Sequence, residues 1–221
     1  MISDLRGIFF YGELEDNWIG HQMVDIYHDQ IYRPLLPLLK EHTTALDIGG
    51  NIGLVSMYLS HYFEKVITLE PSSEHFDAFN RNLQINNITN VTPINKALYI
   101  KNGKFPFGGP IKNKTMRSLH MATWPEGKQE EVVDAITLDT LFEEQKIDHV
   151  DLLKLDIEGS EFEVLAHSSF KKVAPKIDVI IGEFHKWAGR HPNQIREALE
   201  LNGFKMSGLP HDSEIFIGKR I

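Results

Sequence analysis

Residues 45–53 read ALDIGGNIG and carry the clearest indication of the fold. Its opening residues are mostly apolar and are typical of a short buried strand. Gly49 and Gly50 follow, and because neither carries a Cβ they permit a tight turn in which the main chain can approach a ligand. Gly53 allows a helix, expected over Leu54–Tyr62, to pack closely on the sheet. The stretch therefore predicts a strand, a ligand-binding turn and a helix.

Strands and helices continue to alternate after this turn. The alternation implies a parallel sheet covered on both faces, whereas the short link between the last two strands makes them an antiparallel pair. We therefore predict a doubly wound, Rossmann-like α/β fold with a mostly parallel seven-stranded sheet, an antiparallel C-terminal strand and helices on both faces. The expected elements after the first helix are strands at 66–69 and 91–94 around a helix at 74–86, a strand at 151–155, a helix at 160–166, a strand at 179–181, a helix at 192–201, and strands at 204–207 and 214–217.

Two segments lie outside this alternation. Residues 1–42 carry apolar and polar residues at helix-like spacing toward their end, and we expect an N-terminal helical extension that Pro34 and Pro37 kink. Residues 43–221 form the main domain. Within it, residues 99–131 are rich in glycine and proline without a clear period, which predicts an irregular insert.

Composition narrows the classes of function. The 221 residues suffice for one domain with a full core, and the absence of cysteine excludes disulfides, thiolate zinc sites and a cysteine nucleophile. It also fits a cytoplasmic protein. The net charge of −8 disfavours binding to nucleic acid phosphates, and the sequence has neither a secretory signal nor an apolar run that would span a membrane. We therefore expect no nucleic acid or membrane partner, and nothing in the sequence indicates an oligomeric state.

An acidic residue follows the glycine turn at the spacing that nucleotide-binding folds use. Glu70 lies 23 residues after Asp47, at the end of the second expected strand, where a carboxylate can accept hydrogen bonds from ribose hydroxyls. The dinucleotide pattern G-x-G-x-x-G does not fit, because ending it at Gly53 puts Ile48 at the first glycine. A sulfonium nucleoside has no pyrophosphate to approach, and Asp47 suits the cationic amino end of S-adenosylmethionine.

Three segments carry a family resemblance. They are the glycine turn at 46–53, ITLDTL at 136–141 and DLLKLDIEGSE at 151–161, and together they resemble the FkbM family of class I S-adenosylmethionine-dependent methyltransferases. The resemblance covers roughly residues 45–98 and 132–185. It implies S-adenosylmethionine as cofactor and O-methylation of a hydroxyl on a saccharide or small natural product. Gly50 departs slightly from the family, in which alanine is common there, and the insert at 99–131, where we expect substrate choice to lie, matches no pattern.

The resemblance also implies where the cofactor lies. The glycine turn would line its methionine end and ribose, Glu70 would bind the ribose hydroxyls, and residues after the second and third strands would lie beside the adenine. Asp156, at the end of the fourth strand, would face the methionine part. The cofactor-binding residues expected on these grounds are Asp47, Gly49, Gly50, Asn51, Glu70, Pro71, Ser72, Lys96, Ala97 and Asp156.

Candidate catalytic residues follow the fourth and fifth expected strands, which lie about 4.8 Å apart. Asp156 and Glu158 come after the fourth strand, and Glu183 and His185 come after the fifth. His185 is expected as a general base because its ordinary pKa lies near neutrality, with capping of a loop as the alternative. Asp156 and Glu183 could instead hold Mg²⁺. We favour a site without metal, since the cofactor alone explains Asp156 and one remaining carboxylate is a poor cage for this ion.

Two classes of function remain open. One is a methyltransferase that acts on a small-molecule or saccharide acceptor, and the other is a non-catalytic nucleoside-binding module of the same fold. The glycine turn and Glu70 support both. The convergence of Asp156, Glu183 and His185 on one cleft favours the enzyme.

Overall fold

The structure is a computed structural model of the chain. It describes residues 2–3, 9–10, 32–110, 117–120, 127–207 and 214–221.

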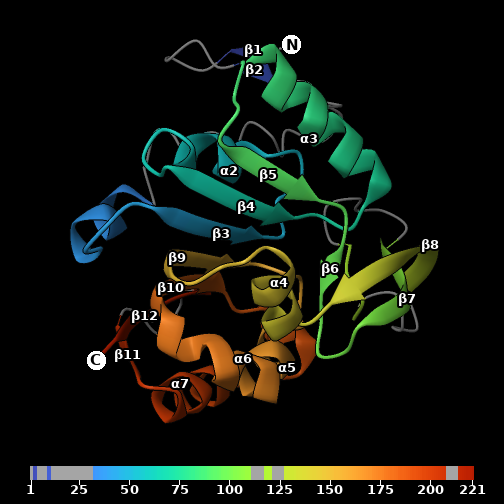
Figure 1. The fold of residues 1–221 in the computed structure, drawn as a ribbon. Coiled ribbons are helices and arrows are strands. Elements are labelled where there is room, and N and C mark those ends of the chain that lie inside the picture. Colours follow the sequence, from blue (N-terminus) through green and yellow to red (C-terminus); the bar gives the residue numbers. More distant parts are fainter. Residues whose placement is uncertain (1, 4–8, 11–31, 111–116, 121–126, 208–213) are drawn as a thin grey trace.

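A seven-stranded sheet runs through the centre of the molecule, in the order β11-β12-β10-β9-β3-β4-β5 (Figure 1). The strands from β10 to β5 are parallel, and β12 is antiparallel to both of its neighbours. This confirms the fold class expected from the sequence. The strands are β3 (Thr44–Ile48), β4 (Lys65–Leu69), β5 (Val91–Ile94), β9 (Val150–Leu155), β10 (Ile177–Glu183), β11 (Phe204–Ser207) and β12 (Ile215–Arg220).

Helices cover both faces of the sheet (Figure 1). Neighbouring strand residues point to opposite faces, so Leu46 and Leu153 pack with α4 to α7, whereas Ala45 and Leu152 pack with α2 and α3. The helices are α2 (Leu54–Leu59), α3 (Ser73–Ile85), α4 (Leu138–Glu144), α5 (Glu161–Ala166), α6 (Ser168–Val173) and α7 (Pro192–Leu201), with 3-10 turns η2 (Arg33–Leu38), η4 (Ala174–Lys176) and η5 (Lys186–Ala188).

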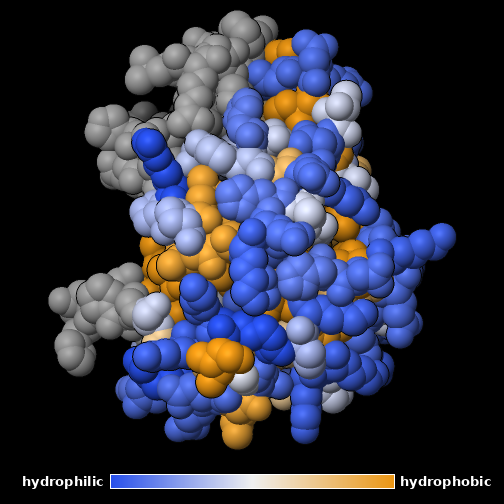
Figure 2. All heavy atoms as spheres, turned by 60° about the vertical axis from the view of Figure 1, so that its left-hand side comes forward, coloured by the Kyte–Doolittle hydropathy of each residue, from blue (hydrophilic) through white to orange (hydrophobic). Residues whose placement is uncertain are grey.

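Most buried apolar side chains of the described residues lie in the two cores formed in this way, one on each face of the sheet. The surface seen in Figure 2 is mostly hydrophilic, with hydrophobic residues gathered in a few places. Among the helices of the described residues, none has the length and apolar character that crossing a membrane requires.

A second, smaller sheet stands beside the first and corrects the expectation of an irregular insert. It has the order β6-β8-β7, built from β6 (Ala97–Leu98), β7 (Gly103–Pro110) and β8 (Gly127–Ile136). The antiparallel pair β7–β8 occupies much of the described part of residues 99–131. Pro106 is accommodated because β7 is an edge strand, where a missing N–H costs little. Most of the glycines and prolines that suggested irregular structure lie within β7, and Gly127 begins β8, whereas Pro125 lies outside the described residues.

The N-terminal segment has less described structure than the rest of the chain. β1 (Ile2–Ser3) and β2 (Phe9–Phe10) form a short antiparallel pair, and Pro34 and Pro37 both lie in the 3-10 turn η2. Residues 11–31 lie outside the described residues, so the helical extension at 1–42 stays a prediction there.

Candidate functional site

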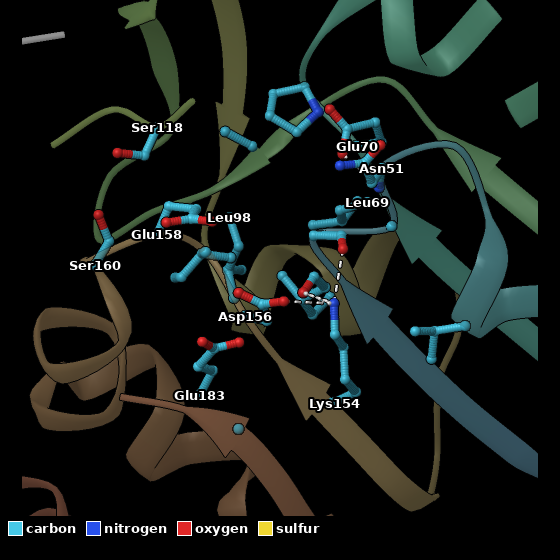
Figure 3. Close-up of a pocket in the computed structure, with 18 of the residues that line it drawn as sticks. Asn51, Leu69, Glu70, Leu98, Ser118, Lys154, Asp156, Glu158, Ser160 and Glu183 are labelled. Carbon is cyan, nitrogen blue, oxygen red and sulfur yellow. Dashed lines mark hydrogen bonds and ion pairs between the residues drawn. The ribbon is translucent and has the colours of Figure 1, made fainter. Parts of the chain in front are cut away.

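A cavity of about 270 Å³ lies at the carboxyl edge of the central sheet (Figure 3). Its wall includes the residues that follow four parallel strands, among them Gly49 after β3, Glu70 after β4, Asp156 after β9 and Glu183 at the end of β10. Open α/β sheets bind ligands at this edge, next to the point where the strand order reverses. Here that point lies between β3 and β9.

Gly49 and Gly50 of the glycine turn lie in the cavity wall, and both make close contacts with other parts of the protein. Gly49 has a φ of +85°, and a Cβ on it would lie 1.8 Å from the carbonyl oxygen of Asp156. A Cβ on Gly50 would lie 2.2 Å from the Thr68 side chain. The glycines therefore let the end of β3 pass close to β9 and β4. This close approach to other parts of the protein is a reason for glycine that the sequence did not indicate, and an approach of the same turn to a ligand stays a prediction.

Glu70 is a buried carboxylate, and each of its two oxygens accepts a hydrogen bond from a main-chain N–H group. Its Oε2 accepts a hydrogen bond of 2.7 Å from the Asn51 N–H, and its Oε1 accepts one of 2.8 Å from the Ser72 N–H. Burial raises the pKa of Glu70 to about 7, although these two hydrogen bonds oppose the change. Each carboxylate oxygen can accept a second hydrogen bond, so Glu70 keeps capacity for hydroxyl donors from the cavity that it lines.

Lys154 is a cavity residue that the sequence analysis missed. Its ammonium donates a hydrogen bond of 2.7 Å to the Gly49 carbonyl and pairs with Asp156 Oδ2 at 3.4 Å (Figure 3). It also pairs with Asp47 Oδ1 at 3.3 Å. Burial alone lowers the pKa of Lys154, but the two carboxylates outweigh it and raise that pKa. The signal was present in the sequence, because a lysine inside the apolar strand β9 requires a buried partner.

Asp47 does not line the cavity. It is fully buried, and its second oxygen accepts a hydrogen bond of 2.6 Å from the Ser56 hydroxyl. Its side chain therefore acts on the cavity through Lys154, which corrects the direct contact with a cofactor that we expected from the sequence.

The other expected cofactor residues divide into two groups. Pro71 and Ala97 line the cavity. Ser72 is fully buried beneath the wall and caps α3 by accepting a hydrogen bond from the His75 N–H. Lys96 points elsewhere and pairs with Glu144 at 3.0 Å. The structure thus brings Gly49, Gly50, Asn51, Glu70, Pro71, Ala97 and Asp156 together, and leaves Asp47, Ser72 and Lys96 outside the wall.

His185 is buried behind the wall among carboxylates. Its Nδ1 lies 2.9 Å from Glu161 Oε1, and its Nε2 lies 3.2 Å from Glu158 Oε2. Carboxylate oxygens of Asp156 and Glu183 lie 3.9 and 4.0 Å from the same Nε2. Burial alone lowers the pKa of His185, but Glu161 and the other carboxylates raise it to about 10. An imidazolium with both nitrogens engaged has no free position for a proton. This environment does not suit the general-base role expected from the sequence.

Three carboxylates form an acidic wall at this end of the cavity: Asp156, Glu158 and Glu183 (Figure 3). Burial and the charge of Asp156 raise the pKa of Glu158 to about 8 and that of Glu183 to about 7. The backbone of Glu158 has a φ of +52°. The loop that carries it is held by Glu161, whose carboxylate accepts the N–H groups of Ile157 and Gly159. Such a wall can accept protons near neutral pH.

The preference for a site without metal stays a prediction. Asp156, Glu158 and His185 each offer a ligand atom, and these atoms lie within 4.8 Å of one another. Mg²⁺ prefers oxygen ligands in octahedral geometry, whereas His185 Nε2 lies here against Glu158. The arrangement of these side chains is explained by the imidazolium and its carboxylate partners.

Comparisons with known proteins agree with this fold. The magnesium protoporphyrin IX methyltransferase from Synechocystis, solved with bound S-adenosylmethionine, superposes with a TM-score of 0.54 at 16% identity, over 96% of this chain and 88% of that one. The fold is thus that of the Rossmann-like methyltransferases. Residues 47–206 match the methyltransferase FkbM domain, and the chain belongs to that family.

Curated relatives are methyltransferases as well. "Methyltransferase 1" of Beauveria bassiana is 27% identical over 144 residues, which cover 54% of this chain and 56% of that protein. This chain thus spans little more than half of that relative's length. The hexuronic acid methyltransferase AglP of Haloferax volcanii is 26% identical over 227 aligned residues, covering 100% of this chain and 89% of AglP.

Proposed function

We propose that the chain is an S-adenosylmethionine-dependent O-methyltransferase that methylates a hydroxyl on a saccharide or a small natural product. The observation that carries the proposal is a single cavity with two chemically different ends. Glu70 and the glycine turn form one end, and the acidic wall forms the other. The family, the neighbour with bound S-adenosylmethionine and the relative named for hexuronic acid support it.

The residues of the cavity fit this cofactor. Glu70 would accept hydrogen bonds from the ribose hydroxyls, and Pro71 and Ala97 would lie against the adenine. The turn at Gly49 would lie along the methionine part, whose amino group Asp156 would bind. Ser72 and Lys96 would support the adenine end without touching it, and Asp47 would act through Lys154.

The acidic wall provides the protein's part in methyl transfer. When bound, S-adenosylmethionine supplies a methyl carbon activated by a sulfonium. The chain must place the acceptor hydroxyl in line with that carbon and receive its proton. Glu158 and Glu183, with pKa values of about 8 and 7, are suited to receive it. His185 keeps these carboxylates in position as a buried cation, and no divalent ion is required in this scheme.

The test is methyl transfer by the full chain with a panel of glycosides and hydroxylated metabolites. We expect release of S-adenosylhomocysteine with at least one hydroxylated acceptor, at a rate that EDTA leaves unchanged. Binding of S-adenosylhomocysteine with no turnover on any acceptor would favour the non-catalytic module. Loss of turnover in EDTA that Mg²⁺ restores would overturn the scheme without metal.

A further inference from the structure

A short segment between β7 and β8 crosses the cavity wall. Residues 117–120, which we name the strap, contribute Arg117, Ser118 and Leu119 to the lining. The middle of the strap is fixed to β7, because Ser118 and Gly108 exchange two main-chain hydrogen bonds of 2.8 and 3.3 Å. Leu119 is buried with Phe107 in the small core of the antiparallel pair β7–β8, which we call the ribbon. The strap is therefore a built part of the cavity.

One end of the strap is anchored on helix α3 by Arg117. The guanidinium is only 8% exposed and donates to the Ser72 hydroxyl at 3.0 Å and to Glu74 at 3.2 Å. Its Nε lies 2.8 Å from Glu130 of β8. Arginine presents its donors in a rigid planar fork, so several simultaneous partners fix its position closely. Arg117 thereby joins the ribbon to the first turn of α3.

Through Ser72, Arg117 is connected to Glu70 at the cofactor end of the cavity. The Ser72 hydroxyl accepts from Arg117, and the Ser72 N–H donates to Glu70 at 2.8 Å. The ribbon makes a second contact at the same place, where the Ser73 hydroxyl donates to Glu131 at 2.8 Å. The position of the strap is therefore coupled to the residue that we place at the ribose.

The other end of the strap reaches the acidic end of the cavity. The His120 ring lies 5.9 Å, centroid to centroid, from the ring of Trp187 in η5. Trp187 in turn packs against the His185 ring at 5.4 Å, and a Cβ on Gly159 would lie 3.0 Å from it. The strap thus runs from the Glu70 side to the His185 side, across the part of the wall where a bound cofactor would lie.

We propose that the strap retains the bound cofactor and sets its rate of exchange, with Arg117 as the positioning residue that holds it closed. The inference rests on the proposed function, since it takes the cavity as the S-adenosylmethionine site. Four residues anchored at both ends restrict the exit of a ligand that they cover. Because the strap lines the cavity, releasing one anchor removes contacts with the bound ligand as well as the barrier to its passage. Release should therefore become faster by a larger factor than entry, and affinity should fall, since changes at a binding site act mostly on the dissociation rate.

The experiment compares S-adenosylhomocysteine binding by the full chain and by Arg117→Gln, using calorimetry for affinity and stopped-flow for the two rates. We expect Arg117→Gln to bind at least tenfold more weakly, with most of the change in the dissociation rate. Arg117→Lys keeps the charge but loses the fork, and should lie between the two. Lys104→Gln is the matched control, because it breaks the exposed Lys104–Asp134 pair of the same ribbon, away from the cavity.

Two further variants keep the inference testable if Arg117→Gln folds poorly. Glu74→Gln combined with Glu130→Gln removes the charged partners of Arg117 at more accessible positions, and His120→Ala releases the opposite end. Both should speed dissociation. If these folded variants release S-adenosylhomocysteine at the rate of the wild type, the proposed role of the strap is wrong. Absence of binding by the wild type would instead overturn the proposed function.

Discussion

Two buried cations, Lys154 and His185, offset the negative charge of the carboxylates at the acidic end of the cavity. Each is surrounded by carboxylates, and for each the attraction of those carboxylates outweighs the cost of burial, so that the pKa is raised. Removing either cation would leave buried carboxylates without a partner, which is among the more damaging changes to a protein. Both side chains therefore stabilise the folded site, and they affect the reaction only by keeping its carboxylates in place.

The pH dependence of stability tests the state of His185. Its pKa is about 10 in the folded chain and about 6.5 when unfolded. The folded chain thus binds more protons between these values, so the stabilisation is fully present below about pH 6.5 and is lost as pH rises toward 10. Glu158 and Glu183 act in the same direction at lower pH, because their pKa values are also raised.

We therefore expect the melting temperature of the wild type to fall between pH 6.5 and pH 10. His185→Asn should be less stable than the wild type at pH 6.5, and the difference should shrink as pH approaches 10. Calorimetric unfolding at several pH values measures it. A difference that stays constant over this range would mean that His185 is not a buried imidazolium.

Gly49 offers a second test at a single position. A Cβ there would meet the Asp156 carbonyl at 1.8 Å, and the residue has a left-handed backbone with a φ of +85°. Gly49→Ala should therefore lower the free energy of unfolding by more than about 2 kcal/mol, through steric overlap added to backbone strain. Denaturant unfolding measures the loss.

Gly189→Ala is the matched control for that change. Gly189 has a similar φ of +76°, but nothing lies within 4 Å of an added Cβ. Only the cost of the left-handed conformation remains, about 1–2 kcal/mol. An equal loss in the two variants would show that Gly49 is required for its backbone conformation alone.

The elements that sequence patterns predict well are those with clear ends. The boundaries of β5, β11 and α7 agree with the prediction, and α7 begins at Pro192 and is followed by Gly203, as helix ends commonly are. Helices α4 and α6 were not among the expected elements. Their 7 and 6 residues are under two turns, too short for a helical period to emerge. The equally short α2 and α5 were expected because each follows a predicted strand and a glycine turn, whereas α4 follows β8 and α6 follows α5 without that signal.

The ribbon β7–β8 was missed for another reason. Its glycines and prolines are turn signals in most contexts, and only pairing with a neighbour shows that β7 is an edge strand. The strap could not be predicted either, because Arg117 is joined to residues of α3 that precede it by more than 40 positions. Contacts of this kind depend on how the ribbon docks on the helix.

In the whole molecule, the sheet order explains why the expected site residues meet. β9 lies between β3 and β10, so Gly49, Asp156 and Glu183 end at one edge although they are far apart in the sequence. That arrangement follows from general rules for parallel sheets and was predictable. The ion pairs of Lys154 and the carboxylates around His185 were not, since they depend on side-chain distances that no spacing in the sequence encodes.

Calorimetry with S-adenosylhomocysteine shows whether the cavity is a preorganised site for S-adenosylmethionine with Glu70 at the ribose. We predict that the wild type binds with at least micromolar affinity and does not bind NAD. At pH 8, above the Glu70 pKa of about 7, Glu70→Ala should weaken binding by about ten- to a hundredfold, because the hydrogen bonds to this charged acceptor contribute roughly 1.5–3 kcal/mol. Thermal unfolding of the variant serves as the control, since Glu70 also holds the N–H groups of Asn51 and Ser72. An unchanged dissociation constant in a folded Glu70→Ala variant, or no binding by the wild type, would contradict the account.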